Sequence, residues 1–211
     1  MLRVSPHPMA IALAFTKGAS LSPVAALLAL QRAEEPQTPL RIHEITPGDL
    51  HPGLDDGRYN VVITSQPEAT TEWICEPLWH DELGIALPMR SPLLANAEIA
   101  IDMLLSYEVL LWPPYACETS RGQIALLGKD AADIPTASSF ELMATLVAAG
   151  YCVGIAPRSR IMQARSWGII LRPLAGGPHP FSTQLIRARQ GCPPAVERFA
   201  KRARRIAADL P

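Results

Sequence analysis

The sequence predicts an α/β protein with two subdomains, and three observations predict this class. In the first third of the chain, short apolar runs alternate with segments of helical periodicity, which is the β-α-β-α-β order of a parallel sheet covered by helices on both faces. In the middle, two apolar runs follow each other without a helix, which indicates a change of sheet. Residues 138–157, SSFELMATLVAAGYCVGIAP, then join a helix directly to a buried strand, as in half of a second βαβ unit.

Composition and charge restrict the classes of protein to which the chain can belong. Its 211 residues suffice for one large or two small domains with an ample core. Hydrophobic residues make up 48% and charged residues 18%, which is typical of a globular chain. The formal net charge is −1, and no basic stripe precedes the last predicted helix. We therefore do not expect this chain to hold nucleic acid by itself, because phosphate contacts need clustered cations.

The N-terminus imitates a signal peptide only loosely. Arg3 is followed by a short apolar stretch at 9–15, but no convincing cleavage site follows, and a buried first strand explains the stretch better. No stretch approaches the ~20 apolar residues of a membrane span. We therefore expect a cytoplasmic protein without membrane contact.

The first third of the chain predicts three parallel strands and two helices. The strands are expected at 10–15, 40–45 and 59–63. Ser22-Pro23 supplies an N-cap and a proline at the first helical position, so a helix should run from there to Glu35. Its apolar face should carry Val24, Leu27, Leu28 and Gln31. A short helix at 49–56 should end at Gly57.

The middle of the chain predicts two strands, 73–79 and 83–87, then a short helix at 101–105, a strand at 109–112 and a helix at about 121–127. Within 138–157, Ser138 and Glu141 have the spacing of a capping box. One apolar stripe should follow, formed by Leu142, Met143, Leu146 and Val147. Gly150 can end this helix in the left-handed conformation. The run 151–156 suits a strand buried on both faces, and Pro157 should stop it.

The last part of the chain predicts strands at 169–174 and 184–188 and a final helix that starts at Pro193-Pro194. The inward face of this helix should carry Val196, Phe199, Ala203 and Ile206. Its basic residues should face water, and a solvated face explains them better than a binding patch does: Lys201, Arg202, Arg204 and Arg205.

No pattern of catalytic or metal-ligating residues is present. The histidines are scattered, and the sequence has no Ser-His-Asp order, HExxH motif or phosphate loop, so we expect no catalytic residue, no metal, no cofactor and no enzymatic activity. The cysteines are far apart and form no CxxC pair: Cys75, Cys117, Cys152 and Cys192. Free, mostly buried thiols in a reducing compartment are the simplest interpretation, while Cys117 lies in a predicted loop and could be reactive.

Several segments in order resemble the effector-binding, or substrate-binding, domain of the LysR-type transcriptional regulators. They are Leu54-x-x-Gly57-x-x-Asn60-Val61-Val62-Ile63, Glu76-Pro77-Leu78, Leu87-Pro88-x-x-Ser91-Pro92-Leu93 and Leu146-Val147-Ala148-Ala149-Gly150-Tyr151-x-Val153-Gly154-Ile155-x-Pro157, after Pro36 at the end of the first helix. The last is the most specific. Two positions depart from the family pattern: Asn60 stands where Asp is usual, and Cys152 replaces a common Gly.

The resemblance implies a fold like that of the type II periplasmic binding proteins, with two Rossmann-like subdomains joined by two crossover strands and a ligand cleft between them. Subdomain I should comprise 10–79 and 187–211, and subdomain II 80–186. The resemblance also implies a homodimer or homotetramer. Family members begin with a helix-turn-helix that is missing here, so 1–9 would be the tail of a linker, and DNA would be bound only through that missing N-terminal domain.

The ligand site is expected where strands end and helices begin in the two subdomains, because doubly wound folds bind ligands at the carboxyl ends of their strands. The candidate ligand-binding residues are Thr16, Lys17, Gly18, Ser20, Thr46, Thr64, Ser65, Pro114, Tyr115, Thr119, Ser138, Ser139, Phe140 and Pro157. Hydroxyls and helix N-termini stabilise anions, so we expect a small anionic effector. Lys17, Arg121 or Arg158 could add a full charge.

Each candidate also has a purely structural interpretation. Ser20 and Ser138 can serve only as helix caps, Lys17 can be an exposed loop residue, Tyr115 can pack its loop, and Phe140 can belong to the core. Two other functions stay open: a free-standing solute-binding protein of a transport system, and an enzyme on the same two-lobed fold. An upstream helix-turn-helix would indicate the regulator, and a true export signal would indicate transport.

Overall fold

The computed structural model describes residues 10–18, 21–65, 72–113 and 134–209. The chain forms two compact units. Unit 1 comprises Met1–Trp79 and Thr183–Pro211, and unit 2 comprises His80–Ser182. Within the described ranges, no helix combines the length and the apolar content that crossing a membrane requires.

Unit 1 is built on a mixed sheet with the strand order β2-β1-β3-β8. Its strands are β1 (Ile11–Thr16), β2 (Leu40–Ile45), β3 (Val61–Thr64) and β8 (Pro180–Ala188), which unit 1 shares with unit 2. β1 pairs in parallel with both β2 and β3, whereas β8 runs antiparallel to β3. The predicted β-α-β-α-β order with parallel strands is therefore confirmed for the first third of the chain.

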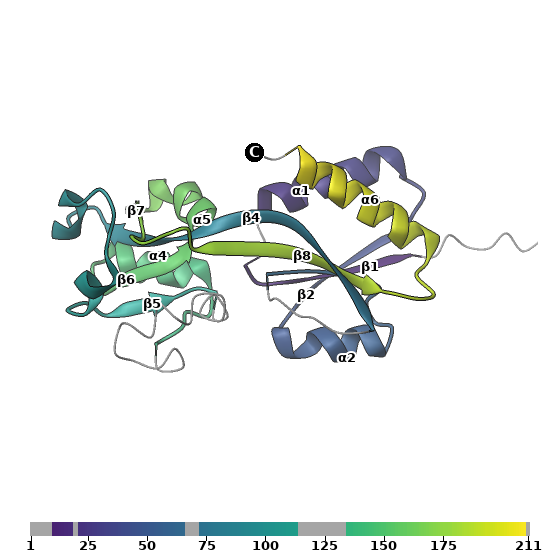
Figure 1. The fold of residues 1–211 in the computed structure, drawn as a ribbon, viewed down its shortest axis with the longest axis horizontal. Coiled ribbons are helices and arrows are strands. Elements are labelled where there is room, and N and C mark those ends of the chain that lie inside the picture. Colours follow the sequence, from purple (N-terminus) through teal and green to yellow (C-terminus); the bar gives the residue numbers. More distant parts are fainter. Residues whose placement is uncertain (1–9, 19–20, 66–71, 114–133, 210–211) are drawn as a thin grey trace, which may run out of the picture. The chain divides into compact units, whose positions relative to one another are not determined.

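Helices cover both faces of the unit 1 sheet (Figure 1). α1 (Leu21–Glu34) and α6 (Pro194–Ala208) lie side by side on one face, and the short 3-10 helix η1 (Pro47–Asp49) leads into α2 (Leu50–Asp55) on the other. Leu13 and Ile63 pack with the first pair of helices, while the alternate residues Ala14 and Val62 pack with α2. This alternation explains why β1 and β3 are apolar at every position before their final threonines, since both of their faces are buried.

Unit 2 has a second mixed sheet. Its strands are β4 (Trp73–Pro88), of which residues 80–88 belong to this unit, β5 (Val109–Leu111), β6 (Val153–Pro157) and β7 (Ile169–Pro173). β5 and β6 are parallel, and β4 runs antiparallel to both β6 and β7. Its short helices are η2 (Pro92–Ala95), η3 (Ile101–Leu104), α4 (Phe140–Ala148), α5 (Arg158–Gln163) and η6 (Arg165–Trp167).

The unit 2 sheet is also covered on both faces. Ile85 and Ile155 pack with η2 and η3, whereas the alternate residues Ala86 and Ala156 pack with α4 and α5. Gly154 gives α4 room to approach, because a Cβ at this position would lie 2.9 Å from the sulfur of Met143. The predicted buried strand at 151–156 is therefore confirmed, although it begins at Val153 and includes Pro157.

Two strands carry the chain between the units. The division falls between Trp79 and His80 in β4, and between Ser182 and Thr183 in β8. β4 and β8 are hydrogen-bonded neighbours, so the full strand order is β2-β1-β3-β8-β4-β6-β5, with β7 also paired to β4. The prediction of two separate strands at 73–79 and 83–87 was wrong. The polar residues 80–82 separate the two apolar runs, but they include no Gly or Pro, and the backbone stays extended through them.

The side chain of Asn60, just before β3, forms hydrogen bonds with the backbone at the start of β1. Its side-chain oxygen accepts a hydrogen bond from the backbone N–H of Ala12 at 2.9 Å, and its amide nitrogen donates to the carbonyl of Ala10 at 3.1 Å. An aspartate could make the first bond but not the second, because an ionised carboxylate has no donor. The departure from the family pattern at this position therefore adds a bond between β1 and the start of β3.

The start of α4 differs from its prediction. Ser139, not Ser138, is the N-cap, and its hydroxyl accepts from the backbone N–H of Leu142 at 3.1 Å. Glu141 therefore lies one position too early to complete a capping box. The same shift turns the helix, so that Leu142 is 45% exposed while Phe140 joins the core. Two adjacent serines made the first position of this helix ambiguous from the sequence.

The basic face of α6 is only partly solvated. Val196, Phe199 and Ala203 are buried as predicted. Arg202, which was expected in water, is buried, and its guanidinium contacts Glu34 at 2.8 Å, Glu35 at 2.9 Å and the Gln31 side-chain oxygen at 3.1 Å. The carboxylates of Glu34 and Glu35 at the end of α1 allow this cation to be buried. Helical periodicity within α6 cannot reveal these partners, because they come from another part of the chain.

Candidate functional site

The carboxyl ends of β1 and β3 bring two predicted site residues together in unit 1. Thr16 is the last residue of β1 and Thr64 the last of β3. The Thr16 hydroxyl donates to the Thr64 hydroxyl oxygen at 3.0 Å, and both side chains are buried. Because the two strands are parallel neighbours, their ends share one edge of the sheet, as the sequence analysis expected.

The next strand end extends this polar cluster. Ser65 directly follows β3, and its hydroxyl lies 3.3 Å from that of Thr183 on β8. Both residues are buried. Four hydroxyls thus occur along the edge formed by β1, β3 and β8: those of Thr16, Thr64, Ser65 and Thr183. Thr183 was not predicted, because its strand was expected to begin only at residue 184.

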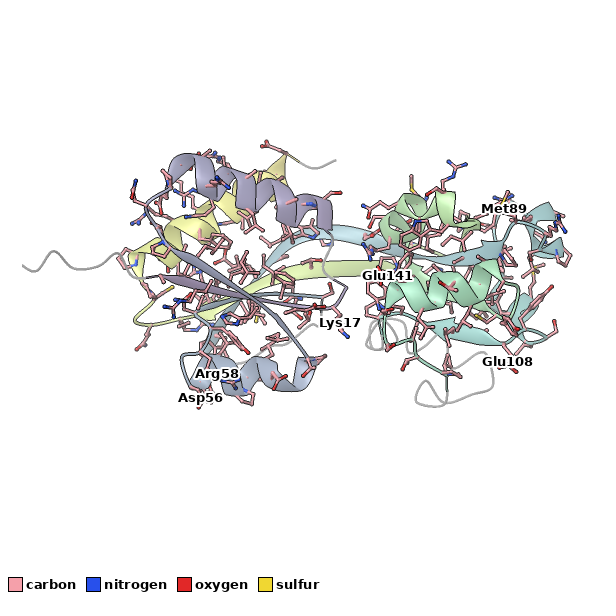
Figure 2. The ribbon with its side chains drawn as sticks, turned by 180° about the vertical axis from the view of Figure 1, so that it is seen from behind. Lys17, Asp56, Arg58, Met89, Glu108 and Glu141 are labelled. Atoms are coloured by element: carbon pink, nitrogen blue, oxygen red, sulfur yellow. The ribbon has the colours of Figure 1, made fainter. Side chains whose placement is uncertain are left out.

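The remaining described candidates of unit 1 are more exposed. Thr46 follows β2, and its hydroxyl donates to the carboxylate of Asp49 at 2.6 Å, so it braces the start of η1. Lys17 and Gly18 form the turn after β1, and Gly18 has a φ of 99°, which favours glycine. Figure 2 shows the Lys17 side chain extending away from the end of β1. It places one cation near the hydroxyl cluster.

The unit 2 candidates gather at the start of α4 and at the end of β6. Ser138 is exposed, Ser139 caps α4, and Pro157 is the last, buried residue of β6. Phe140 is 1% exposed, and its ring packs edge-on against Trp112 at 5.3 Å between centroids. In this structure Phe140 therefore belongs to the core of unit 2.

An arginine that the sequence analysis missed lies beside these residues. The guanidinium carbon of Arg160 lies 4.8 Å from the centroid of the Phe140 ring and 5.5 Å from that of Trp112. Its Nη2 donates to the Glu141 carboxylate at 3.2 Å. Among the described residues, Nε of Arg160 and Nε1 of Trp112 are buried without a hydrogen-bond partner. The sequence signal that could have located Arg160 is the spacing of Ile161 and Ala164 after Pro157, because it indicates the helix α5, which was not predicted.

Arg158, proposed from the sequence as a further cation, is paired within unit 2. Its guanidinium contacts the carboxylate of Glu82 on β4. The adjacent Asp81 accepts a hydrogen bond from the backbone N–H of Ser159 at 3.3 Å. Polar residues 81 and 82 therefore fix the start of α5, and Arg158 brings less unpaired charge than its position suggested.

The other candidates lie outside the described residues: Ser20, Pro114, Tyr115, Thr119 and, as possible sources of charge or reactivity, Arg121 and Cys117. Within the described ranges, no three His, Cys, Asp or Glu side chains are grouped so as to hold a metal ion. Cys75, Cys152 and Cys192 are free, partly buried thiols.

The topology defines the class of protein first. Two α/β units with mixed sheets, linked by two strands, have the fold of the type II periplasmic binding proteins. The chain belongs to the LysR substrate binding domain family, whose family model matches residues 9–208. A comparison with curated protein sequences gives no match.

Solved structures of LysR-type regulators share this fold. Full-length BenM carrying the E226K mutation is 17% identical, with a TM-score of 0.82 over 98% of this chain and 70% of that one. Reduced OxyR from N. meningitidis is 18% identical, with a TM-score of 0.80 over 93% of this chain and 95% of its own. The BenM effector binding domain with its effector benzoate is 18% identical, with a TM-score of 0.79 over 95% and 92% of the two chains.

Proposed function

We propose that this chain is the ligand-sensing domain of a LysR-type transcriptional regulator and that its effector is a small organic anion. The observation that carries the proposal is the hydroxyl cluster of Thr16, Thr64 and Ser65 at the carboxyl ends of neighbouring strands. The family assignment supports the sensing role. The similar domain of BenM was solved with benzoate and that of QuiR with shikimate, and both compounds are carboxylates.

The chemistry of the strand ends favours an anion. Hydroxyl groups can donate to carboxylate oxygens, and the start of α1 follows the Lys17-Gly18 turn closely. Unpaired N–H groups and the dipole at a helix start contribute about 0.3–1 kcal/mol toward a bound anion at exposed sites. Lys17 adds a full positive charge. In unit 2, the capped start of α4 offers the same kind of donor. That one effector bridges the two subdomains stays a prediction.

The effector would act by shifting a conformational equilibrium. A ligand changes the populations of two states only by the difference in its affinity for them, which is commonly about 1–3 kcal/mol. The two linking strands, β4 and β8, would carry that shift, because they alone connect the units. In a regulator, the signal would pass to a DNA-binding domain elsewhere in the protein, in the cytoplasm.

We also propose that the domain works as a homodimer or homotetramer. The outward face of α1 carries alanines, Ala25, Ala29 and Ala33, instead of the charged residues usual on a solvated helix. Ile42 on the edge strand β2 is 48% exposed. Exposed apolar side chains on a helix face and on an open sheet edge favour contact with a second copy of the chain.

The test is a thermal-shift screen of small carboxylic acids against neutral and cationic isosteres, followed by calorimetry of the best acid. At a hundredfold excess over Kd, the acid should raise Tm by roughly 5–10 °C. Thr64→Val removes one cluster hydroxyl and should weaken acid binding about fivefold. The matched control is Thr38→Val, which lies before β2, at the opposite edge of the sheet, and should bind normally.

The proposal fails if no acid shifts Tm while neutral or cationic isosteres give a shift that Thr64→Val removes. It also fails if Thr38→Val and Thr64→Val weaken acid binding equally.

A further inference from the structure

Arg160 on α5 links two neighbouring elements of unit 2, the end of β5 and the start of α4. Its guanidinium carbon lies 5.5 Å from the ring centroid of Trp112, which directly follows β5, and 4.8 Å from that of Phe140, the first residue of α4. Its Nη2 donates to the carboxylate of Glu141, the second residue of α4, at 3.2 Å. One side chain thus holds the first turn of the helix on which the unit 2 candidates for effector binding lie.

The first turn of α4 has two backbone N–H groups without a partner among the described residues. The hydroxyl of Ser139 accepts from the N–H of Leu142, and the carbonyl of Ser139 accepts from that of Met143. The N–H groups of Phe140 and Glu141 come earlier in the turn and donate to no described residue. Unpaired N–H groups at the start of a helix favour an anion, and the helix dipole acts in the same direction.

Further unpaired donors surround this turn. In the described part of the chain, five buried side-chain atoms lack a hydrogen-bond partner, and three of them belong to Arg160, its neighbour Ser159 and the stacked Trp112. Nε of Arg160 and Nε1 of Trp112 can only donate a hydrogen bond, and the hydroxyl of Ser159 can do so. The surroundings of the turn are therefore rich in donors and poor in acceptors.

The positive charge of Arg160 is only weakly compensated. Its side chain is 14% exposed, whereas Glu141, its one ion-pair partner among the described residues, is 59% exposed. Water screens an exposed carboxylate, so this ion pair neutralises the more deeply buried guanidinium incompletely. Arg158, two residues earlier, is 38% exposed and pairs with Glu82 on β4 instead.

This arrangement does not favour stability. A mostly buried cation with one exposed partner and an unpaired Nε loses more hydration than its contacts return, and replacing a buried ion pair by apolar side chains is often neutral or stabilising. An anion at the start of α4 would instead meet both the unpaired donors and the excess positive charge. The contacts of Arg160 therefore suit binding better than they suit folding.

We propose that Arg160 makes the start of α4 selective for an anionic group. It fixes the first turn, from which the N–H groups of Phe140 and Glu141 donate, and it keeps a positive charge beside them. Arg160 is thus a positioning residue that acts through α4. The inference rests on the proposed function, because it assumes an anionic effector, and it adds the residue of unit 2 that discriminates the charge of that effector.

Calorimetry of the full chain tests the inference. The probe is the acid that raises Tm most in a screen that includes benzoate and shikimate, and the neutral amide of that acid is the comparison. Arg160→Met removes the charge and should weaken binding of the acid about fivefold, with little effect on binding of the amide. The Tm of the ligand-free Arg160→Met chain should equal or exceed that of the wild type.

Two further variants serve as controls. Arg160→Lys keeps the charge and should retain more of the preference for the acid over the amide than Arg160→Met does. Arg158→Met removes the neighbouring cation, which is paired with Glu82, and should leave the Kd of the acid unchanged.

Three results would overturn the inference: unchanged acid binding in Arg160→Met, equal weakening of the acid and the amide, or an equal loss of acid binding in Arg158→Met. Equal weakening of both compounds together with a lower Tm would make Arg160 purely structural. If Thr64→Val weakens acid binding and Arg160→Met does not, this inference fails while the proposed function stands. If no acid binds, both fail.

Discussion

The ion pairs between the end of α1 and α6 make the acid stability of this domain depend on the carboxyl group of Glu35. Glu35 follows the last residue of α1 and is 15% exposed. It contacts the guanidinium of Arg198 and lies 2.9 Å from that of Arg202, and the Thr38 hydroxyl donates to it at 3.1 Å. These donors hold the pKa of Glu35 at about 2, chiefly through Arg198, although burial opposes them.

A carboxyl whose pKa is lower in the folded state than in the unfolded state stabilises the fold above its unfolded pKa. For Glu35, this stability is fully present above the ordinary value of 4.5 and is lost as the pH falls toward 2. At 1.36 kcal/mol per pKa unit, the lowering of the Glu35 pKa from 4.5 to about 2 contributes about 3 kcal/mol to the unfolding free energy.

Glu35→Gln should therefore remove most of this dependence. Between pH 5 and pH 2, the unfolding free energy of the wild type should fall by about 3 kcal/mol more than that of Glu35→Gln. Urea unfolding at a series of pH values measures this difference directly. The matched control is Glu44→Gln on the exposed edge strand β2, which should follow the wild-type curve. Parallel curves for the wild type and Glu35→Gln would refute the role given to these contacts.

Two further substitutions test local features of the fold by urea unfolding. Ser139→Ala removes the cap of α4 and should lower the unfolding free energy by about 1 kcal/mol, which is more than Ser138→Ala should. A larger loss for Ser138→Ala than for Ser139→Ala would show that Ser138 is the cap. Gly53→Ala places a Cβ 2.0 Å from the ring of the buried Tyr59 and should lower the unfolding free energy by about 1–3 kcal/mol. The control is Gly48→Ala, whose Cβ meets nothing within 4 Å. Equal effects of the two substitutions would show that Tyr59 moves aside at no cost.

The sequence predicted the elements whose signal is local. Apolar runs at β1, β2 and β3 gave the parallel sheet, and the rule for parallel strands then brought Thr16, Thr64 and Ser65 to one edge. Those three could be located because each directly ends or follows a strand. The family resemblance added the two linking strands, which no local pattern contains.

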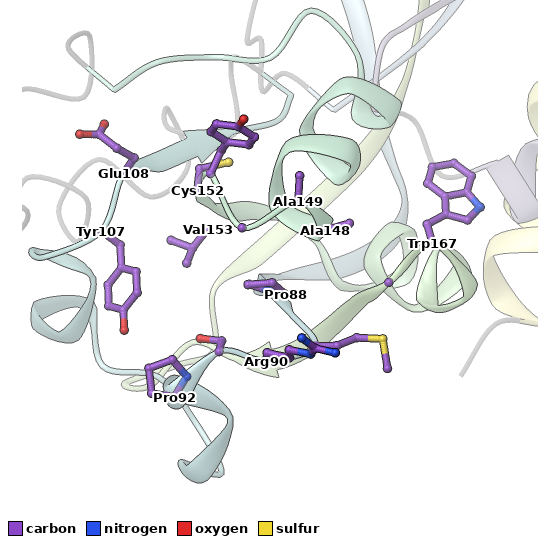
Figure 3. Close-up of a pocket in the computed structure, with 15 residues that line it drawn as sticks. Pro88, Arg90, Pro92, Tyr107, Glu108, Ala148, Ala149, Cys152, Val153 and Trp167 are labelled. Carbon is purple, nitrogen blue, oxygen red and sulfur yellow. The ribbon is translucent and has the colours of Figure 1, made fainter.

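Errors arose where tertiary contacts decide the outcome. Arg202 can be buried because Glu34, the last residue of α1, and Glu35, which follows it, contact its guanidinium. Arg160 lies beside Phe140 and Trp112 because α5 follows β6 at once, and a six-residue helix gives too short a pattern to recognise. A hollow in unit 2, lined among others by Glu108, Cys152 and Trp167 (Figure 3), combines residues from four separated segments, so no stretch of sequence predicts it.

A crystal structure of the full chain grown with the most stabilising carboxylic acid tests the central claim most directly. We expect the carboxylate of the bound acid within hydrogen-bond distance of a hydroxyl of Thr16, Thr64 or Ser65. An acid bound in another place, with these hydroxyls contacting only the protein, would contradict the assignment of this edge of the sheet as the effector site.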